Sequence, residues 1–155
     1  MSIEKVTRYF REQGAEDKIK VFDVSSATVE LAAAALGTQE ARIAKTMAFL
    51  VEGKAVLIVT AGDMKIDNAK YKAKFHTKAK MLTPEELEEL VGHNIGGVCP
   101  FALKEGCGVY LDESLKRFDV VYPAAGSANS AVELTVSELE KYSGGIWLDV
   151  CKSRV

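Results

Sequence analysis

The residues best suited to chemistry lie in a loop from Gly92 to Phe101, with the sequence GHNIGGVCPF. The adjacent Gly96 and Gly97 let a ligand approach the backbone closely and leave amide groups exposed as hydrogen-bond donors. Pro100 and Phe101 fix the far end of the loop, because proline restricts its own backbone and phenylalanine is typical of a buried anchor. A plain connection between a helix and the next strand stays open as the alternative, since glycine clusters are common in turns.

Three further positions carry candidate reactive groups. Cys99 lies in the same loop, and a thiol beside amide donors is a candidate nucleophile. Lys45 stands directly before an apolar run at 46–51, where a lysine is either a cation held at the edge of a pocket or a side chain that reaches out to water. A second loop of small residues offers the amide of Gly126 and the hydroxyl of Ser127, with a wide turn between strands as the alternative.

Other common active-site patterns are absent from the sequence. There is no Gly-x-Ser-x-Gly pattern, no Walker loop and no dinucleotide fingerprint. His76 and His93 have no partner at a recognisable spacing, and the three cysteines match no zinc pattern. We therefore expect neither a metal nor a cofactor. What remains is a set of backbone amides, a lysine and hydroxyls, which can bind an anion or polarise a carbonyl group.

A long apolar hairpin is expected at the centre of the fold. Its two strands, 46–51 and 55–60, are almost continuously apolar and are separated by Glu52-Gly53-Lys54. Helices are predicted over Val29–Leu36 and Asp67–Lys74 and after the capping boxes that begin at Thr83 and Thr135. Shorter strands are predicted at 19–24, 108–111, 118–122 and 146–150, with a charged turn joining 108–111 to 118–122. This mixture of helices and strands, with hairpins, indicates an α+β fold with an antiparallel or mixed sheet.

Length and composition indicate a single globular domain that covers residues 1–155. The chain is 48% hydrophobic and 27% charged, an ordinary soluble profile without an apolar run that could cross a membrane. The N-terminus lacks the apolar core of a signal peptide, so we expect a cytoplasmic protein with free thiols. The net charge of −2 disfavours nonspecific binding along nucleic acid, although it allows contact with an end. The lysines between 70 and 80 form either a solvated face or a patch that contacts phosphates.

Three segments together resemble the YbaK/prolyl-tRNA-synthetase-associated domain family. They are ARIAKTM around Lys45, GGVCPF at 96–101, and Gly126-Ser127 ahead of the apolar stretch at 132–134. Members of this family are freestanding or synthetase-inserted domains that edit mischarged tRNA. The resemblance runs in order over 21–139, and the combination of lysine-threonine before a strand with the glycine-glycine-x-x-proline-phenylalanine loop is more specific than either segment alone.

The resemblance implies a mixed, mostly antiparallel, barrel-like sheet surrounded by helices. It also implies a trans-acting aminoacyl-tRNA deacylase, which hydrolyses the ester of a mischarged tRNA, with tRNA-Pro carrying a small wrong amino acid as the expected substrate. The expected partners are the acceptor end of that tRNA, with prolyl-tRNA synthetase or another translation factor as candidates, and no membrane. In this family the substrate's own ribose hydroxyl acts as general base through water, which fits a sequence without an acid–base pair. The alternative is a noncatalytic module that binds a nucleotide or an aminoacyl-nucleotide end.

The matched positions supply the expected site residues. Lys45 matches the family's lysine that contacts the terminal nucleotide, and the backbone of Gly96 and Gly97 matches the loop that orients the aminoacyl carbonyl, so these three are expected to be catalytic. The expected substrate-binding residues are Thr46, Cys99, Pro100, Phe101, Gly126 and Ser127.

Two positions depart from the family pattern. Ala102 stands where many members have glycine after the proline-aromatic pair, which stiffens the loop. Ala131 stands where the cysteinyl-type deacylases carry an aspartate, so the sequence does not indicate cysteinyl specificity.

Overall fold

The computed structural model describes residues 2–154 of the chain. The helices are α1 (Ser2–Glu12), α2 (Val29–Leu36), α3 (Asn68–Phe75), α4 (Pro84–Leu90) and α5 (Val136–Ser143), with short 3₁₀ helices at Glu16–Lys18, Glu40–Arg42 and Glu113–Arg117. The strands are β1 (Ile19–Val21), β2 (Ile43–Val51), β3 (Lys54–Ala61), β4 (Met64–Ile66), β5 (Gly108–Asp112), β6 (Val120–Pro123), β7 (Ser130–Val132), β8 (Leu134–Thr135), β9 (Ile146–Leu148) and β10 (Cys151–Ser153). None of the helices in residues 2–154 has the length and apolar character needed to cross a membrane.

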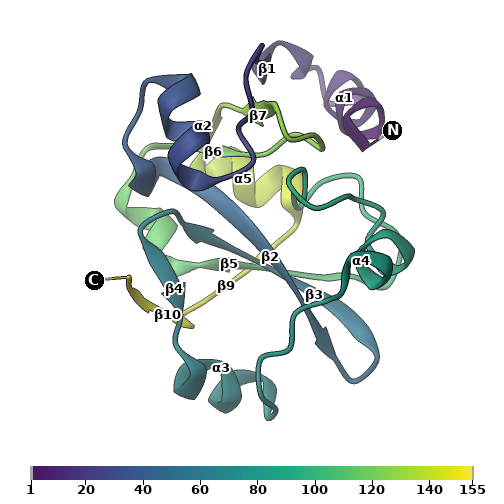
Figure 1. Ribbon diagram of the computed structural model, residues 1–155, viewed down its shortest axis with the longest axis vertical. Coiled ribbons are helices and arrows are strands. Elements are labelled where there is room, and N and C mark those ends of the chain that lie inside the picture. Colours follow the sequence, from purple (N-terminus) through teal and green to yellow (C-terminus); the bar gives the residue numbers. More distant parts are fainter. Residues whose placement is uncertain (1, 155) are drawn as a thin grey trace.

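A curled six-stranded sheet in the order β8-β6-β2-β3-β5-β9 forms the centre of the structure (Figure 1). Its longest part is the predicted hairpin of β2 and β3, closed by a two-residue turn in which Glu52 and Gly53 both have positive φ, as a type I′ turn requires. The pairs β2–β3 and β6–β8 are antiparallel, whereas β2–β6, β3–β5 and β5–β9 are parallel. Two further antiparallel pairs, β1–β7 and β4–β10, flank this sheet. The expected α+β fold with a mixed, curled sheet is therefore confirmed.

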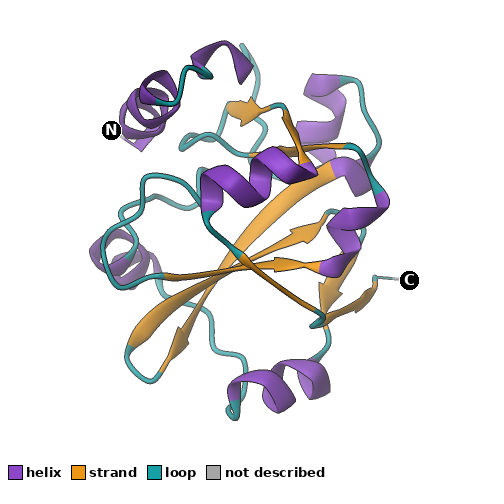
Figure 2. Ribbon diagram, turned by 180° about the vertical axis from the view of Figure 1, so that it is seen from behind, coloured by secondary structure: helices purple, strands orange, loops and turns teal. Residues whose placement is uncertain are grey.

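Helices cover both faces of the central hairpin, as its apolar sequence predicts. On one face α1 and α5 bury Phe10 and Leu139 in the main core, and α5 lies across the sheet in Figure 2. On the other face Tyr71 of α3 packs against Phe49 of β2, with ring centroids 5.2 Å apart. Because both faces are covered, β3 is buried after its first residue.

The helix boundaries follow the predicted caps. Thr83 and Thr135 each form a complete capping box, in which the hydroxyl accepts from the third helical amide and the glutamate there accepts from the cap's own amide. Thr28 caps α2, and Asp67 caps α3 through two backbone amides. Local hydrogen bonds of this kind are determined within four residues, which explains why the sequence predicts them well.

The strand predictions were less accurate. The strand expected over 19–24 ends at Val21, and the charged turn between 108–111 and 118–122 is a 3₁₀ helix. The two strands that it joins do not pair with each other, because β5 pairs with β3 and β6 pairs with β2. The pair β4–β10 was not predicted, since it joins two three-residue segments that are far apart in the sequence.

Ala102 is held in the left-handed conformation, with φ of 54°, a conformation that favours glycine. An alanine in this region costs about 1–2 kcal/mol relative to glycine, while the greater freedom of glycine in the unfolded chain offsets about 0.5–1 kcal/mol. We expect Ala102→Gly to raise the free energy of unfolding by roughly 0.5–1 kcal/mol, measured by urea denaturation. Ala34→Gly, at an exposed position within α2, is the matched control and should lower it by about 1 kcal/mol. Equal losses for both variants would contradict this account of the loop.

Candidate functional site

A cavity of about 420 Å³ opens where the start of β2 meets the beginning of α2 and the glycine loop. Its walls come from residues 26–29 and Ala32, from 43–48 of β2, from Met81 and Leu82, from Ile95, Gly96 and Val98, and from the segments around Tyr122 and Ser130. Of the nine predicted site residues, Lys45, Thr46 and Gly96 line this cavity directly. A cavity of this size is typical of a small-molecule site.

The two predicted loops are in contact with each other. A Cβ atom on Gly97 would lie 2.6 Å from both the carbonyl carbon of Gly126 and the amide nitrogen of Ser127, so only glycine allows this backbone-to-backbone approach. Gly96 has φ of +92°, and a Cβ atom there would lie 3.3 Å from the Cβ of Ala128. Glycine is thus required at both positions by packing and conformation, independently of any ligand.

Within the glycine loop the amide of Gly97 is already used. It donates to the carbonyl of Asn94 at 3.1 Å and closes a turn around Gly96. Gly96 and Val98, on either side, line the cavity and present its loop wall. The amide of Gly97 can orient a substrate carbonyl only if this turn opens; otherwise Gly96 and Val98 must supply the contact. The role of Gly97 therefore stays a prediction.

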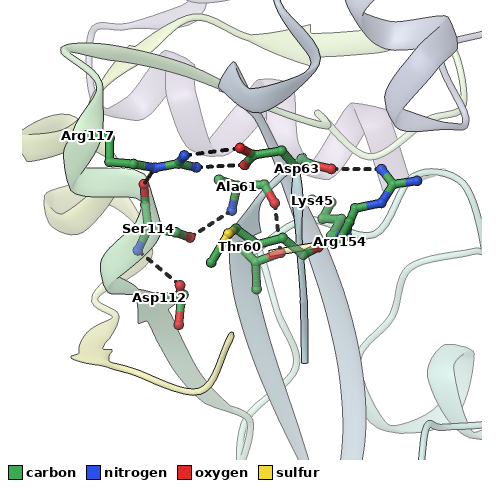
Figure 3. A network of polar contacts seen from close by, with 10 residues as sticks. Lys45, Thr60, Ala61, Asp63, Asp112, Ser114, Arg117 and Arg154 are labelled. Carbon is green, nitrogen blue, oxygen red and sulfur yellow. Dashed lines mark hydrogen bonds and ion pairs between the residues drawn. The ribbon is translucent and has the colours of Figure 1, made fainter. Parts of the chain in front are cut away.

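Lys45 reaches the β3–β4 turn, where its Nζ donates to the carbonyl of Met64 (Figure 3). Burial lowers the pKa of this ammonium, and the positive charge of Arg154 lowers it further. The nearby carboxylate of Asp63 receives a two-point contact from Arg117, at 2.6 and 3.0 Å. The head group of Lys45 is therefore half-buried beside the cavity, with Arg154 as a second cation and the carboxylates of Asp63 and Glu30 acting in the opposite direction.

Thr46 lines the cavity and carries a buried hydroxyl. Its Oγ1 is buried and has no hydrogen-bond partner among residues 2–154. Its peptide group points to the outer edge of β2, since alternate residues of a strand face one edge, and Ala48 and Leu50 bond there to the segment 80–82. Farther back along this edge, Ala44 pairs with β6. Thr46 lies between these two pairings, so a ligand at this edge can reach both its hydroxyl and its peptide group.

Ser127 does not line the cavity but contacts Ser130, which does. Its hydroxyl contacts that of Ser130 at 2.6 Å and donates to the Oδ1 of Asn129 at 2.9 Å. Ser130 is buried and lines the cavity, whereas Gly126 and Ser127 do not. The sequence analysis missed Ser130, together with Met81 and Ile95 at the rim, because a serine inside a short strand and isolated apolar residues carry no motif.

Cys99, Pro100 and Phe101 lie beneath the loop, within the core. Phe101 packs edge-to-face on Phe10, with ring centroids 4.8 Å apart. The Nε2 of His93 donates to the carbonyl of Phe101 at 2.8 Å, and the Sγ of Cys99 lies 3.5 Å from the same nitrogen. These contacts anchor the loop from below, and a direct contact of the three residues with substrate stays a prediction.

Burial raises the pKa of Cys99 to about 12, so the thiol stays protonated at neutral pH. We expect Cys99→Ser and Cys99→Ala to hydrolyse a mischarged tRNA within roughly threefold of the wild-type rate, because neither removes a reactive thiolate. The measurement is single-turnover ester hydrolysis, with circular dichroism as a control for folding. A loss of several orders of magnitude in both folded variants would instead indicate a covalent thiol mechanism.

Metal-ligating side chains do not converge anywhere in the described chain. Among residues 2–154 no group of three His, Cys, Asp or Glu side chains could hold a metal ion. His76 ends α3 at an exposed position, and His93 is buried beneath the glycine loop. The polar groups offered by the cavity are those of Lys45, Thr46, Ser130 and the loop backbone, which are suited to binding an anion and a carbonyl group.

Comparisons with known sequences and structures identify the family. The sequence profile of the aminoacyl-tRNA editing domain matches residues 23–142. An uncharacterised protein of Bacillus subtilis (strain 168), YwhH, is 51% identical over 98% of both chains. The proline–tRNA ligase of Leuconostoc citreum (strain KM20) is 28% identical over 73% of this chain, which corresponds to 20% of the ligase. The crystal structure of a proposed trans-editing enzyme for prolyl-tRNA synthetase superposes with a TM-score of 0.89, at 29% identity over 98% of both chains. The chain belongs to the aminoacyl-tRNA editing domain family.

Proposed function

We propose that this chain is a trans-acting deacylase that hydrolyses the ester of a mischarged tRNA in the cytoplasm, with a small wrong amino acid on tRNA-Pro as its substrate. The observation that carries the proposal is the cavity itself, in which Lys45, Thr46 and Gly96 surround one space. Membership of the editing-domain family supports the deacylase class. The similarity to proline–tRNA ligases and to the proposed trans-editing enzyme supports the choice of tRNA.

The walls of the cavity support a small, uncharged amino acid. Six alanines line it: Ala27, Ala32, Ala44, Ala48, Ala124 and Ala131. Ala131 is buried at the position where the cysteinyl-type deacylases carry an aspartate, so this wall offers no carboxylate to a polar side chain. Pockets of this kind discriminate by size, and one methylene is worth about 1–3 kcal/mol.

In the proposed mechanism the protein binds, orients and polarises, and supplies no nucleophile. The ammonium of Lys45 holds the terminal nucleotide, and the loop backbone at Gly96 and Val98 orients the carbonyl on which negative charge develops during attack by water. The neighbouring ribose hydroxyl of the substrate accepts a proton from that water and passes its own proton to the ester oxygen, which leaves as a ribose hydroxyl. The ester bond breaks, and the free amino acid and the intact tRNA end leave the cavity.

A panel of mischarged tRNAs tests this function. Alanyl- and cysteinyl-tRNA-Pro, seryl-tRNA-Ala and correctly charged prolyl-tRNA-Pro are incubated with excess protein, and ester loss is compared with the spontaneous rate. We expect alanyl-tRNA-Pro to be hydrolysed fastest and prolyl-tRNA-Pro to be spared. Binding across the panel without ester loss above the spontaneous rate would favour the noncatalytic module instead.

A further inference from the structure

Two cations converge on the β3–β4 turn beside the cavity. Lys45 donates from its Nζ to the carbonyl of Met64, and Arg154 donates from its Nη1 to the carbonyl of Gly62 at 2.9 Å. The backbone amide of Arg154 also donates to the carbonyl of Asp63 at 3.1 Å. Both side chains are thus bonded to the segment 62–64, and the charge of Arg154 acts on the ammonium of Lys45 (Figure 3).

This turn borders the cavity at the start of α2. A Cβ atom on Gly62 would lie 2.8 Å from the Cγ1 of Val29, which lines the cavity. On the same turn of helix, Glu30 lies 3.7 Å from the Nη2 of Arg154. Arg154 therefore bridges the start of α2 and the turn that holds Lys45. Val29 and Lys45, which line the cavity, adjoin these two segments.

The charged groups around Lys45 and Arg154 leave positive charge that a bound anion would neutralise. Asp63 is engaged by both terminal nitrogens of Arg117, so its carboxylate is already neutralised. Glu30 meets Arg154 at a distance longer than a good charge-assisted hydrogen bond, and both side chains are about half exposed. A guanidinium has five N–H donors in a planar fork, and those not bonded to Gly62 can donate to a better acceptor.

We propose that Lys45 and Arg154 together form a phosphate-binding pair, which takes the phosphate on the 5′ side of the substrate's terminal nucleoside. The proposal rests on the proposed function, since it names the group of that substrate that this edge of the cavity binds. Arg154 lies outside residues 23–142, the span that matches the family profile, so the profile says nothing about a role for this residue. The compact ammonium and the fork of the guanidinium approach one phosphate from two sides, and Glu30 is displaced when the phosphate arrives.

The probes are adenosine and adenosine 5′-monophosphate, which differ by this phosphate alone. We expect the wild-type protein to bind the monophosphate about tenfold more tightly or better, by calorimetric or NMR titration. Arg154→Ala should reduce this preference to roughly twofold while leaving adenosine binding unchanged, and Arg154→Lys should restore part of it. Lys152→Ala, which removes an exposed cation two residues away, is the matched control and should keep the wild-type preference.

The ratio of the two affinities separates phosphate binding from a purely structural role. If Arg154 served only to hold the turn, its loss would lower the melting temperature without changing the ratio, and that result would overturn the proposal. Arg154→Gln, which keeps donors for Gly62 but not the charge, replaces the alanine variant if that variant unfolds. A wild-type protein without preference for the monophosphate would also overturn it. These titrations need no ester hydrolysis. A protein that is inactive in the tRNA panel would therefore contradict the proposed deacylase function, whereas the phosphate preference would still be decided by the titrations.

Discussion

Lys45→Ala is expected to slow single-turnover hydrolysis of alanyl-tRNA-Pro by about 30- to 1,000-fold, which corresponds to roughly 2–4 kcal/mol of transition-state stabilisation. The reason is the position of the ammonium, half-buried at the cavity's edge and held by the carbonyl of Met64. Removing it takes away the charge that fixes the terminal nucleotide while water attacks the ester. Lys45→Arg should recover only part of the rate, because a planar guanidinium presents its donors differently.

Two further variants make the Lys45 result specific. Lys45→Met keeps most of the apolar stem but removes the charge, so it should be as slow as the alanine variant. Lys54→Ala removes an exposed lysine at the far end of the same hairpin and should retain the wild-type rate. Circular dichroism should show all four proteins folded. A folded Lys45→Ala protein with the wild-type rate would rule out Lys45 as a substrate-positioning group.

Thr46→Val is expected to slow hydrolysis by roughly ten- to a hundredfold and, at the same time, to leave stability unchanged or raise it by about 1 kcal/mol. The hydroxyl of Thr46 is buried without a partner among residues 2–154, and valine removes it with little change of shape. A hydroxyl of this kind costs stability in the free protein and is satisfied only when a ligand accepts or donates a hydrogen bond. Thr46→Ser, which keeps the hydroxyl, should retain most of the rate.

Thr135→Val is the matched control for Thr46 because it should show the opposite pattern. Its hydroxyl caps α5 away from the cavity, so its loss should cost about 1 kcal/mol of stability and leave hydrolysis unchanged. Rates from single-turnover assays and unfolding free energies from urea denaturation are needed for all three variants. If Thr46→Val destabilised the protein and kept its rate, the hydroxyl would have a structural role and no place in substrate binding.

The parts of the fold that the sequence predicts well depend on local interactions. The β2–β3 hairpin follows from two apolar runs around Glu52-Gly53, and the capping boxes at Thr83 and Thr135 follow from residues three positions apart. The pairing of β4 with β10 depends on contacts between residues 64–66 and 151–153, which no local pattern records. For the same reason the sequence indicates strands near 108 and 118 but not their partners.

The candidate-site residues likewise fall into those that a sequence motif indicates and those that only the structure reveals. Resemblance to a family indicates Lys45, Thr46 and Gly96, and the structure places all three around one cavity. The resemblance does not indicate Ser130, which lines the cavity, or Arg154, which follows the last strand and contacts Gly62 and Glu30. The close contact of Gly97 with Gly126 is likewise visible only in three dimensions, because no local pattern records a contact between loops separated in the sequence by two strands.

The most direct test of the central claim, that the Lys45–Gly96 cavity binds the aminoacyl end of tRNA, is an NMR titration with alanyl-adenosine joined by a non-hydrolysable 3′-amide. We expect the largest changes in backbone amide shifts at Thr46, Gly96 and Val98, which surround the cavity. Amides at the distant end of α1, near Glu12, should not move. Saturable shifts confined to the lysine-rich helix α3, with none at Thr46, Gly96 or Val98, would contradict the assignment of this cavity as the site.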